Sequence, residues 1–192
     1  SSIQGFNIID ERWLDDLVRF ESHSVYRMLN EHFVHQVPWE ETERYCRMKN
    51  IFDNGGSTPF LDVPAEEQTL DMYHEYLEYV DDLYYTIRSE GYRSQSELSA
   101  ESNFVNDKFN SSLNEIQVMI ASDGTICHHY GAHRLSIAKI LDVDSIPVRT
   151  RVRNSKWQQI RDEMAEANSP SEIDSSIKKH TSHPDLGDIQ FS

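Results

Sequence analysis

The sequence has few cysteines, and this shortage excludes two classes of protein. Its 192 residues contain two cysteines, Cys46 and Cys127, which form no CxxC pair. This pattern argues against a disulfide framework and against a cysteine zinc site, and it favours free thiols in a reducing compartment. We therefore expect a cytoplasmic protein.

The sequence also has no long apolar run. No stretch approaches the 18 or so apolar residues that a transmembrane helix needs. The first residues, SSIQGFNIIDERW, lack the basic segment followed by an apolar segment that is typical of a signal peptide. We therefore expect no membrane partner.

Basic residues are scarce relative to acidic ones. The chain has 18 Lys and Arg against 33 Asp and Glu, which gives a net charge of −15, and Arg outnumbers Lys by 12 to 6. Such a chain repels phosphate backbones unless its basic residues cluster, so the balance disfavours a nucleic-acid partner. The composition is typical of salt-adapted, haloarchaeal-type proteins, although a merely acidic mesophilic protein has it too.

Helical periodicity dominates the first hundred residues. Segments near residues 10–20, 24–34 and 38–52 each place apolar residues on one stripe. The clearest helix spans residues 69–90, ends before Gly91, and has a stripe at spacings of three and four: Leu70, Tyr73, Leu77, Val80, Tyr84 and Ile87. This tyrosine-rich stripe predicts core packing, and an interface in a homo-oligomer stays open.

The spacing of apolar residues changes after residue 114 from a helical period to the alternation of a strand. Alternating residues predict a strand at 116–120, Asp123-Gly124 predicts a hairpin turn, and a second strand follows to residue 129. A helix near 132–141, a strand near 145–153 and a helix near 155–167 complete a mixed α and β layout without a repeating βαβ series. Asn154 or Ser155 is expected to cap the last helix. We predict three regions: helical residues 1–100, a compact core over 101–167, and a polar, mobile tail over 168–192.

The stretch HHYGAHRLSIAKIL, residues 128–141, combines a strand, a glycine turn and a helix start. Free backbone N–H groups and the positive end of the helix dipole meet at such a turn. His133 and Arg134 add side-chain donors, and Arg binds phosphate in bidentate fashion. The stretch therefore predicts an anion site, with an ordinary strand-to-helix connection as the alternative.

The longer segment DGTICHHYGAHRLSIAKILDVDSIPVRTRVR resembles the core motif of the ParB/sulfiredoxin superfamily. The resemblance covers Glu115 to Arg153, and its matching positions are Gly131, His133, Arg134, Ala138, Leu141, Ile146, Pro147 and Val148. It implies an α+β fold with a ParB/sulfiredoxin-like small mixed sheet and helices, preceded here by the helical N-terminal region. It does not select one activity, because fold does not fix function.

The resemblance implies a nucleotide-binding turn. The phosphate-binding positions that it implies are Gly131, Ala132, His133, Arg134, Leu135 and Ser136. The implied ligand is ADP, ATP or CTP with Mg²⁺, and the implied reaction is phosphoryl transfer to a small hydroxyl acceptor or nucleotide hydrolysis. His133 would stabilise charge on the phosphate, and Glu115 would act as general base, although Glu115 equally fits a solvated position before a strand.

Two residues depart from the family pattern. Ala132 stands where sulfiredoxins carry the catalytic Cys, which excludes their chemistry. Tyr130 replaces an Asp that several relatives have before the glycine, so an acid that helps to hold a metal is missing. We predict no protein metal site, because His128 and His129 point to opposite faces of a strand. A catalytically inactive interaction domain therefore remains an alternative.

Three arginines alternate along the strand VRTRVR. Arg149, Arg151 and Arg153 are expected to share one face and to form the densest basic stripe of the chain. This stripe would bind an anion, either nucleotide phosphate or nucleic acid. It is also the basis for a second alternative, a ParB-like DNA-binding protein or nuclease. Salt bridges to acidic helices explain the stripe equally well.

Overall fold

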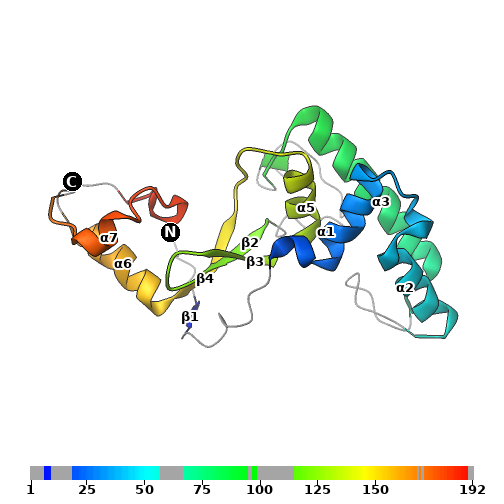
Figure 1. Cartoon of the computed structure of the whole chain (residues 1–192), viewed down its shortest axis with the longest axis horizontal. Coiled ribbons are helices and arrows are strands. Elements are labelled where there is room, and N and C mark those ends of the chain that lie inside the picture. The colour runs from blue at the N-terminus through cyan, green and yellow to red at the C-terminus, as the bar shows by residue number, and fades with distance from the viewer. Residues whose placement is uncertain are drawn as a thin grey trace. The chain divides into compact units, whose positions relative to one another are not determined.

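The computed structural model describes residues 7–9, 19–56, 67–94, 97–98, 115–167, 169 and 171–189 (Figure 1). The chain divides into two compact units. Unit 1 comprises residues 1–17, 117–130 and 148–192, and unit 2 comprises residues 18–116 and 131–147. Both units are therefore built from separate stretches of sequence, unlike the three consecutive regions predicted above. No helix in the described ranges is long and apolar enough to cross a membrane.

Unit 1 contains a four-stranded mixed sheet in the order β1-β4-β2-β3. Its strands are β1 (Asn7–Ile9), β2 (Gln117–Ile120), β3 (Ile126–Tyr130) and β4 (Arg149–Asn154). The β1–β4 and β2–β4 pairs are parallel, and the β2–β3 pair is antiparallel. The α+β class is thereby confirmed. The prediction of an entirely helical N-terminal region is wrong at β1, because its three residues pair with a strand more than a hundred positions away.

The turn between β2 and β3 forms at the predicted Asp-Gly pair. The Asp123 carboxylate accepts a hydrogen bond of 2.8 Å from the Thr125 amide, and Gly124 has φ +90°. A Cβ on Gly124 would stand 2.6 Å from a ring carbon of Trp157. Glycine is therefore needed there both for its backbone conformation and for the close approach of the indole.

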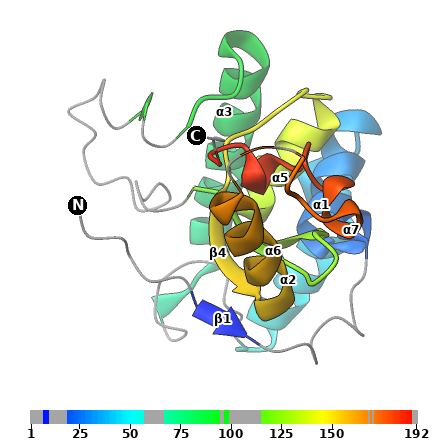
Figure 2. The ribbon, with the colours of Figure 1, turned by 90° about the vertical axis from the view of Figure 1, so that its left-hand side faces the viewer.

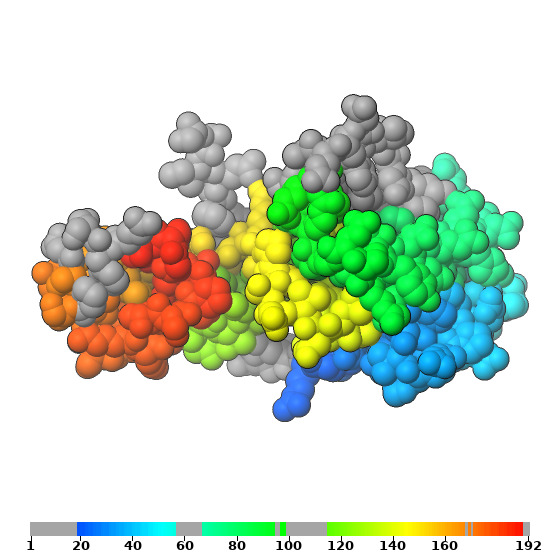
Figure 3. Space-filling model, turned by 90° about the horizontal axis from the view of Figure 1, so that it is seen from above, coloured from blue at the N-terminus to red at the C-terminus, as the bar shows by residue number. Residues whose placement is uncertain are grey.

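The C-terminal elements of unit 1 pack into one apolar cluster. They are α6 (Ser155–Glu166), α7 (Ser175–Lys178) and the 3₁₀ turn η6 (Pro184–Leu186), drawn as the orange and red ribbon of Figure 2 and the orange and red atoms of Figure 3. Asn154, one of the two predicted cap residues, caps α6. The buried members of the cluster are Ile120, Trp157, Met164, Ile173, Ile177 and Leu186. Residues 171–189 are thus a packed part of unit 1, and the predicted mobile tail is corrected accordingly.

Unit 2 is helical among its described residues. Its elements are η2 (Phe20–Ser22), α1 (Ser24–Leu29), the π-helical turn η3 (Asn30–Val34), η4 (Trp39–Glu41), α2 (Glu43–Asp53), α3 (Leu70–Glu90) and α5 (Ala132–Ile140). Thr42 and Thr69 cap α2 and α3 through their hydroxyls. Part of the helix predicted near residues 10–20 lies outside the described residues.

The core of unit 2 uses the predicted stripe of α3. Tyr73, Leu77, Val80, Tyr84 and Ile87 are all buried there, with Leu70 packed at the edge. Ile137 of α5 is also fully buried in this core. Helix α5 is therefore an integral part of unit 2, although it follows the two strands of unit 1 in sequence.

Candidate phosphate-binding turn

The start of α5 has the glycine turn that the sequence predicts. We call residues 131–134 the α5 turn. Gly131 is the N-cap residue with φ +87° and ψ 35°, in the left-handed region. A Cβ at this position would lie 3.0 Å from the Ile116 Cα and 3.2 Å from its Cγ1. Any side chain on residue 131 would therefore be strained and also crowd Ile116, so the turn requires glycine.

Helix α5 begins with backbone amides that the helix itself does not satisfy. The Leu135 amide donates to the Gly131 carbonyl at 3.1 Å and begins the helical ladder. The preceding amides, of Ala132, His133 and Arg134, have no intrahelical acceptor by helix geometry. Gly131 has no side chain to cap them. Backbone donors and the positive end of the helix dipole are thus combined at this turn.

His133 does not supply a positive charge here. Its Nε2 hydrogen-bonds the hydroxyl of Tyr76, which lies on α3. Burial lowers the pKa of His133 to about 3, with further contributions from the positive charges of Arg44 and His23. The ring is therefore neutral at neutral pH. The prediction that His133 stabilises phosphate charge is corrected for this arrangement, in which the ring contacts the core of unit 2.

Arg134 braces the chain after α3. Its Nε donates to the Tyr92 hydroxyl at 3.2 Å, its Nη2 donates to the Arg93 carbonyl, and its guanidinium lies 4.7 Å from the centre of the Tyr92 ring. The residue is 7% exposed. Its predicted role as a phosphate fork is therefore replaced by a structural one, since these donors already bind the segment that follows α3.

Glu115 belongs to the same cluster. Burial raises the pKa of Tyr92, a hydrogen bond and the charge of Arg134 oppose this, and the negative charge of Glu115 adds to the increase. Glu115 is half-buried and directly precedes Ile116, on which Gly131 packs. Glu115 therefore lies close enough for its charge to act on Tyr92, the residue to which Arg134 donates.

Leu135 and Ser136, the last two predicted phosphate ligands, differ in burial. Leu135 is half-buried and belongs to the first turn of α5. Ser136 is fully buried, and its hydroxyl has no hydrogen-bond partner in the described part of the chain. The role of Ser136 as a phosphate ligand therefore stays a prediction.

The arginines of β4 do not form one stripe. Thr150 pairs with Val118 and Val152 with Met119, so Arg151 is an extra residue at a bulge. The bulge reverses the alternation, and Arg153 then shares a face with Thr150. Arg149 and Arg151 are exposed, whereas Arg153 is 7% exposed. The predicted stripe Arg149, Arg151 and Arg153 is therefore corrected, and the salt-bridge alternative holds for Arg153.

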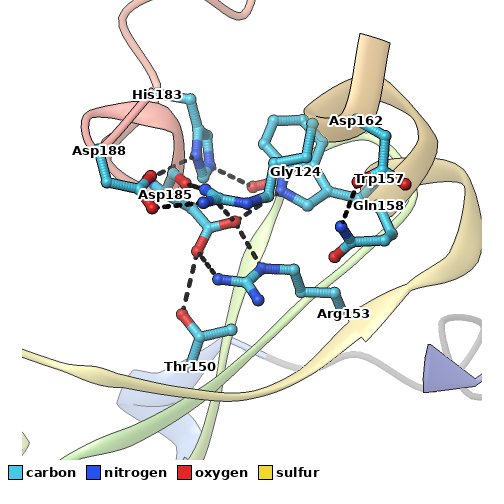
Figure 4. Close-up of polar contacts among 10 residues, drawn as sticks. Gly124, Thr150, Arg153, Trp157, Gln158, Asp162, His183, Asp185 and Asp188 are labelled. Carbon is cyan, nitrogen blue, oxygen red and sulfur yellow. Dashed lines mark hydrogen bonds and ion pairs between the residues drawn. The ribbon is translucent and has the colours of Figure 1, made fainter. Parts of the chain in front are cut away.

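The partner of Arg153 is Asp185, as Figure 4 shows. The Asp185 carboxylate accepts two bonds from Arg153, at 2.9 and 2.8 Å, one from the Trp157 indole at 3.0 Å and one from the Thr150 hydroxyl at 3.1 Å. Arg161 donates to the Asp185 carbonyl. We call this set of contacts the Asp185 anchor. It attaches η6 to β4 and α6 within unit 1.

Electrostatics favour the charged form of Asp185. Burial by itself raises the pKa of this carboxyl, but hydrogen bonds from Arg153 and Trp157 and the charges of Arg153 and Arg161 outweigh it. The net effect is a pKa below the usual value of 3.8. Asp185 was not singled out from the sequence, because nothing local distinguishes it from the other polar residues around it.

The fold and the α5 turn define an α+β chain with an uncapped, glycine-initiated helix. No protein-family model, curated protein or solved structure matches this chain. Among the described residues, no three His, Cys, Asp or Glu side chains gather closely enough to hold a metal ion. We therefore infer function from the geometry of the site.

Proposed function

We propose that the chain binds a nucleotide through its phosphates at the α5 turn, as a ParB/sulfiredoxin-like protein would. The observation that carries this proposal is the left-handed, uncapped Gly131, which leaves the amides of residues 132–134 without a side-chain acceptor. Arg44 adds positive charge beside His133, since that charge lowers the pKa of the ring. An anion is the ligand that best complements these features.

Phosphoryl transfer to a small hydroxyl acceptor is the reaction we propose for this site. The backbone amides of the α5 turn would hold the transferred phosphate, and Mg²⁺ bound to the nucleotide would neutralise part of its charge. Glu115 would take the proton of the acceptor hydroxyl. Arg134 would act as a positioning residue that fixes the turn through Tyr92 and the Arg93 carbonyl.

A matched pair of substitutions at Ala132 tests nucleotide binding. Ala132→Asp places a negative charge at the first helical position, where it interacts favourably with the helix dipole but repels phosphate. Ala132→Asn has nearly the same shape without the charge. We expect ADP, ATP or CTP, with or without Mg²⁺, to stabilise the unsubstituted protein by about 2.7 kcal/mol at a hundredfold excess over Kd, which a thermal melt detects as a higher melting temperature.

The asparagine variant should retain this stabilisation, and the aspartate variant should bind at least about tenfold more weakly. Equal binding by both variants would mean that the phosphates lie elsewhere. No stabilisation by any nucleotide would refute the proposal. Binding without turnover in the presence of Mg²⁺ and hydroxyl acceptors would leave the non-catalytic alternative.

A further inference from the structure

A small pocket between α1 and α2 of unit 2 has three arginines in its lining. Its polar residues are Ser24, Arg27, Glu31, Glu43, Arg44 and Arg47, and we call it the arginine pocket. The cavity volume is about 50 Å³. At 10–15 Å³ of such volume for each water, the pocket has room for roughly three to five waters. It therefore suits one small group, such as a tetrahedral oxyanion, and is too small for a whole nucleotide.

The two acidic residues of the pocket already have partners. The Glu43 carboxylate pairs with the Arg27 guanidinium, and the Glu31 carboxylate accepts a hydrogen bond of 3.0 Å from the Glu43 amide. Arg44 and Arg47 have no carboxylate partner among the residues that the structure describes. The lining carries three arginines against two glutamates, so its net charge is +1 in a chain whose net charge is −15.

Arg44 is held in place by neutral groups. Its Nη1 donates to the Ser24 hydroxyl at 2.7 Å, the Tyr73 hydroxyl lies beside it, and its buried Nε has no acceptor within the described ranges. The charge of Arg44 also lowers the pKa of His23 and of His133, after the larger effect of burial. Among the described residues, no carboxylate forms an ion pair with Arg44.

We propose that the arginine pocket binds the phosphate group of a small phosphomonoester. Arg44 and Arg47 supply the charge and the N–H donors. The Ser24 oxygen accepts from Arg44, so its own hydrogen remains available to donate to the phosphate. Glu31 and Glu43 repel additional negative charge, which favours a single phosphate on a neutral or cationic carrier over a polyphosphate chain. This site lies on α1 and α2 and goes beyond the proposed function at the α5 turn.

Titration calorimetry with inorganic phosphate at low ionic strength tests the pocket. We expect one saturable site that also accepts sulfate and does not accept acetate, because a planar monoanion is a poorer match for a tetrahedral dianion site. Arg47→Gln should weaken phosphate binding roughly tenfold or more, since charged hydrogen bonds are lost. Arg47 is exposed, so the variant should fold normally, and circular dichroism verifies this. Arg88→Gln, an exposed arginine on α3, is the matched control and should bind phosphate unchanged.

The outcomes separate this proposal from the nucleotide proposal. No saturable phosphate binding, or equal binding by Arg47→Gln and Arg88→Gln, overturns the arginine pocket. Phosphate binding that is lost in Ala132→Asp and retained in Arg47→Gln also overturns it, because the anion then lies at the α5 turn. Arg47-dependent phosphate binding without any nucleotide binding supports the pocket and refutes the nucleotide proposal alone.

Discussion

Asp185→Asn should destabilise unit 1 by about 3–5 kcal/mol, because it leaves a buried guanidinium without its counter-ion. The side chains of Arg153 and Asp185 are only 9% and 7% exposed, so solvent screens this pair poorly. Asparagine is nearly isosteric, but it keeps only one acceptor oxygen for the four donated bonds of the anchor. The expected loss of stability therefore comes from the missing charge and hydrogen bonds, because the nearly isosteric side chain leaves no cavity.

Asp188→Asn is the matched control for this substitution. Asp188 pairs with Arg161, but its side chain is 68% exposed. An exposed ion pair contributes between zero and about 1 kcal/mol, so this variant should be nearly as stable as the unsubstituted protein. Both variants remove one negative charge from the same short segment, but Asp185 is buried and accepts four hydrogen bonds, whereas Asp188 is exposed and accepts one.

Hydrogen exchange followed by mass spectrometry measures the effect in each unit separately. A single two-state free energy is not well defined for a chain with two units. In Asp185→Asn, amides of 149–166 and 171–189 that open with unit 1 should exchange more than about 100-fold faster. Amides of 70–90, in unit 2, should be unchanged. If Asp185→Asn and Asp188→Asn destabilised unit 1 equally, or if Asp185→Asn destabilised it by less than about 1 kcal/mol, the buried ion pair would not stabilise unit 1 as we infer.

The difference in stability between the unsubstituted protein and Asp185→Asn should also depend on pH, which provides an independent check. The folded-state pKa of Asp185 lies below its usual value of 3.8, so the unfolded state binds the proton more readily. The stability that the carboxylate contributes is fully present above about pH 4 and is lost as the pH falls through the folded-state pKa. The gap between the unsubstituted protein and Asp185→Asn should therefore narrow in acid. A gap that stays constant down to strong acid would contradict the ionic origin of the anchor.

Two further predictions concern unit 2. Gly131→Ala should cost about 2–4 kcal/mol, because of the positive φ and the contact with Ile116. Gly55→Ala, with φ +68° and open space around the added Cβ, should cost only about 1 kcal/mol when the hydrogen exchange of unit 2 amides is compared; equal costs would exclude the Ile116 contact. The pKa of His133 is lowered from 6.5 to about 3, so its ring should keep the NMR shifts of a neutral imidazole from about pH 8 to pH 5. Because the unfolded chain binds this proton below pH 6.5 and the folded protein does not, the free energy of unfolding should fall by roughly 1.4 kcal/mol per pH unit below pH 6.5. A titration midpoint near 6.5 would contradict its burial.

The elements that the sequence predicts correctly are those with local signals. The stripe from Leu70 to Ile87 repeats at helical spacing within one segment, and the Asp123-Gly124 turn needs only its own two residues and the flanking strands. The cap at Asn154 likewise depends on an amide two residues away. Such features are readable because the groups that interact are neighbours in the chain.

The predictions that fail depend on partners far away in sequence. The bulge at Arg151 follows from pairing with β2, and Arg153 is neutralised by a residue 32 positions later. Tyr76 meets His133 across 57 positions, and Tyr92 meets Arg134 across 42. For the α5 turn, the glycine conformation was therefore predictable, while the direction of the His133 and Arg134 side chains was set by α3 and the segment after it.

The interleaving of the two units has a consequence for synthesis on the ribosome. The chain passes between the units four times, after residues 17, 116, 130 and 147. The helices that emerge first lack Ile137 of α5, which fills their core, until after β2 and β3 have been made. The sheet in turn waits for β4, which joins β1 to β2. Neither unit has all its elements until most of the chain has been synthesised, so we expect both units to fold late and nearly together rather than one after the other.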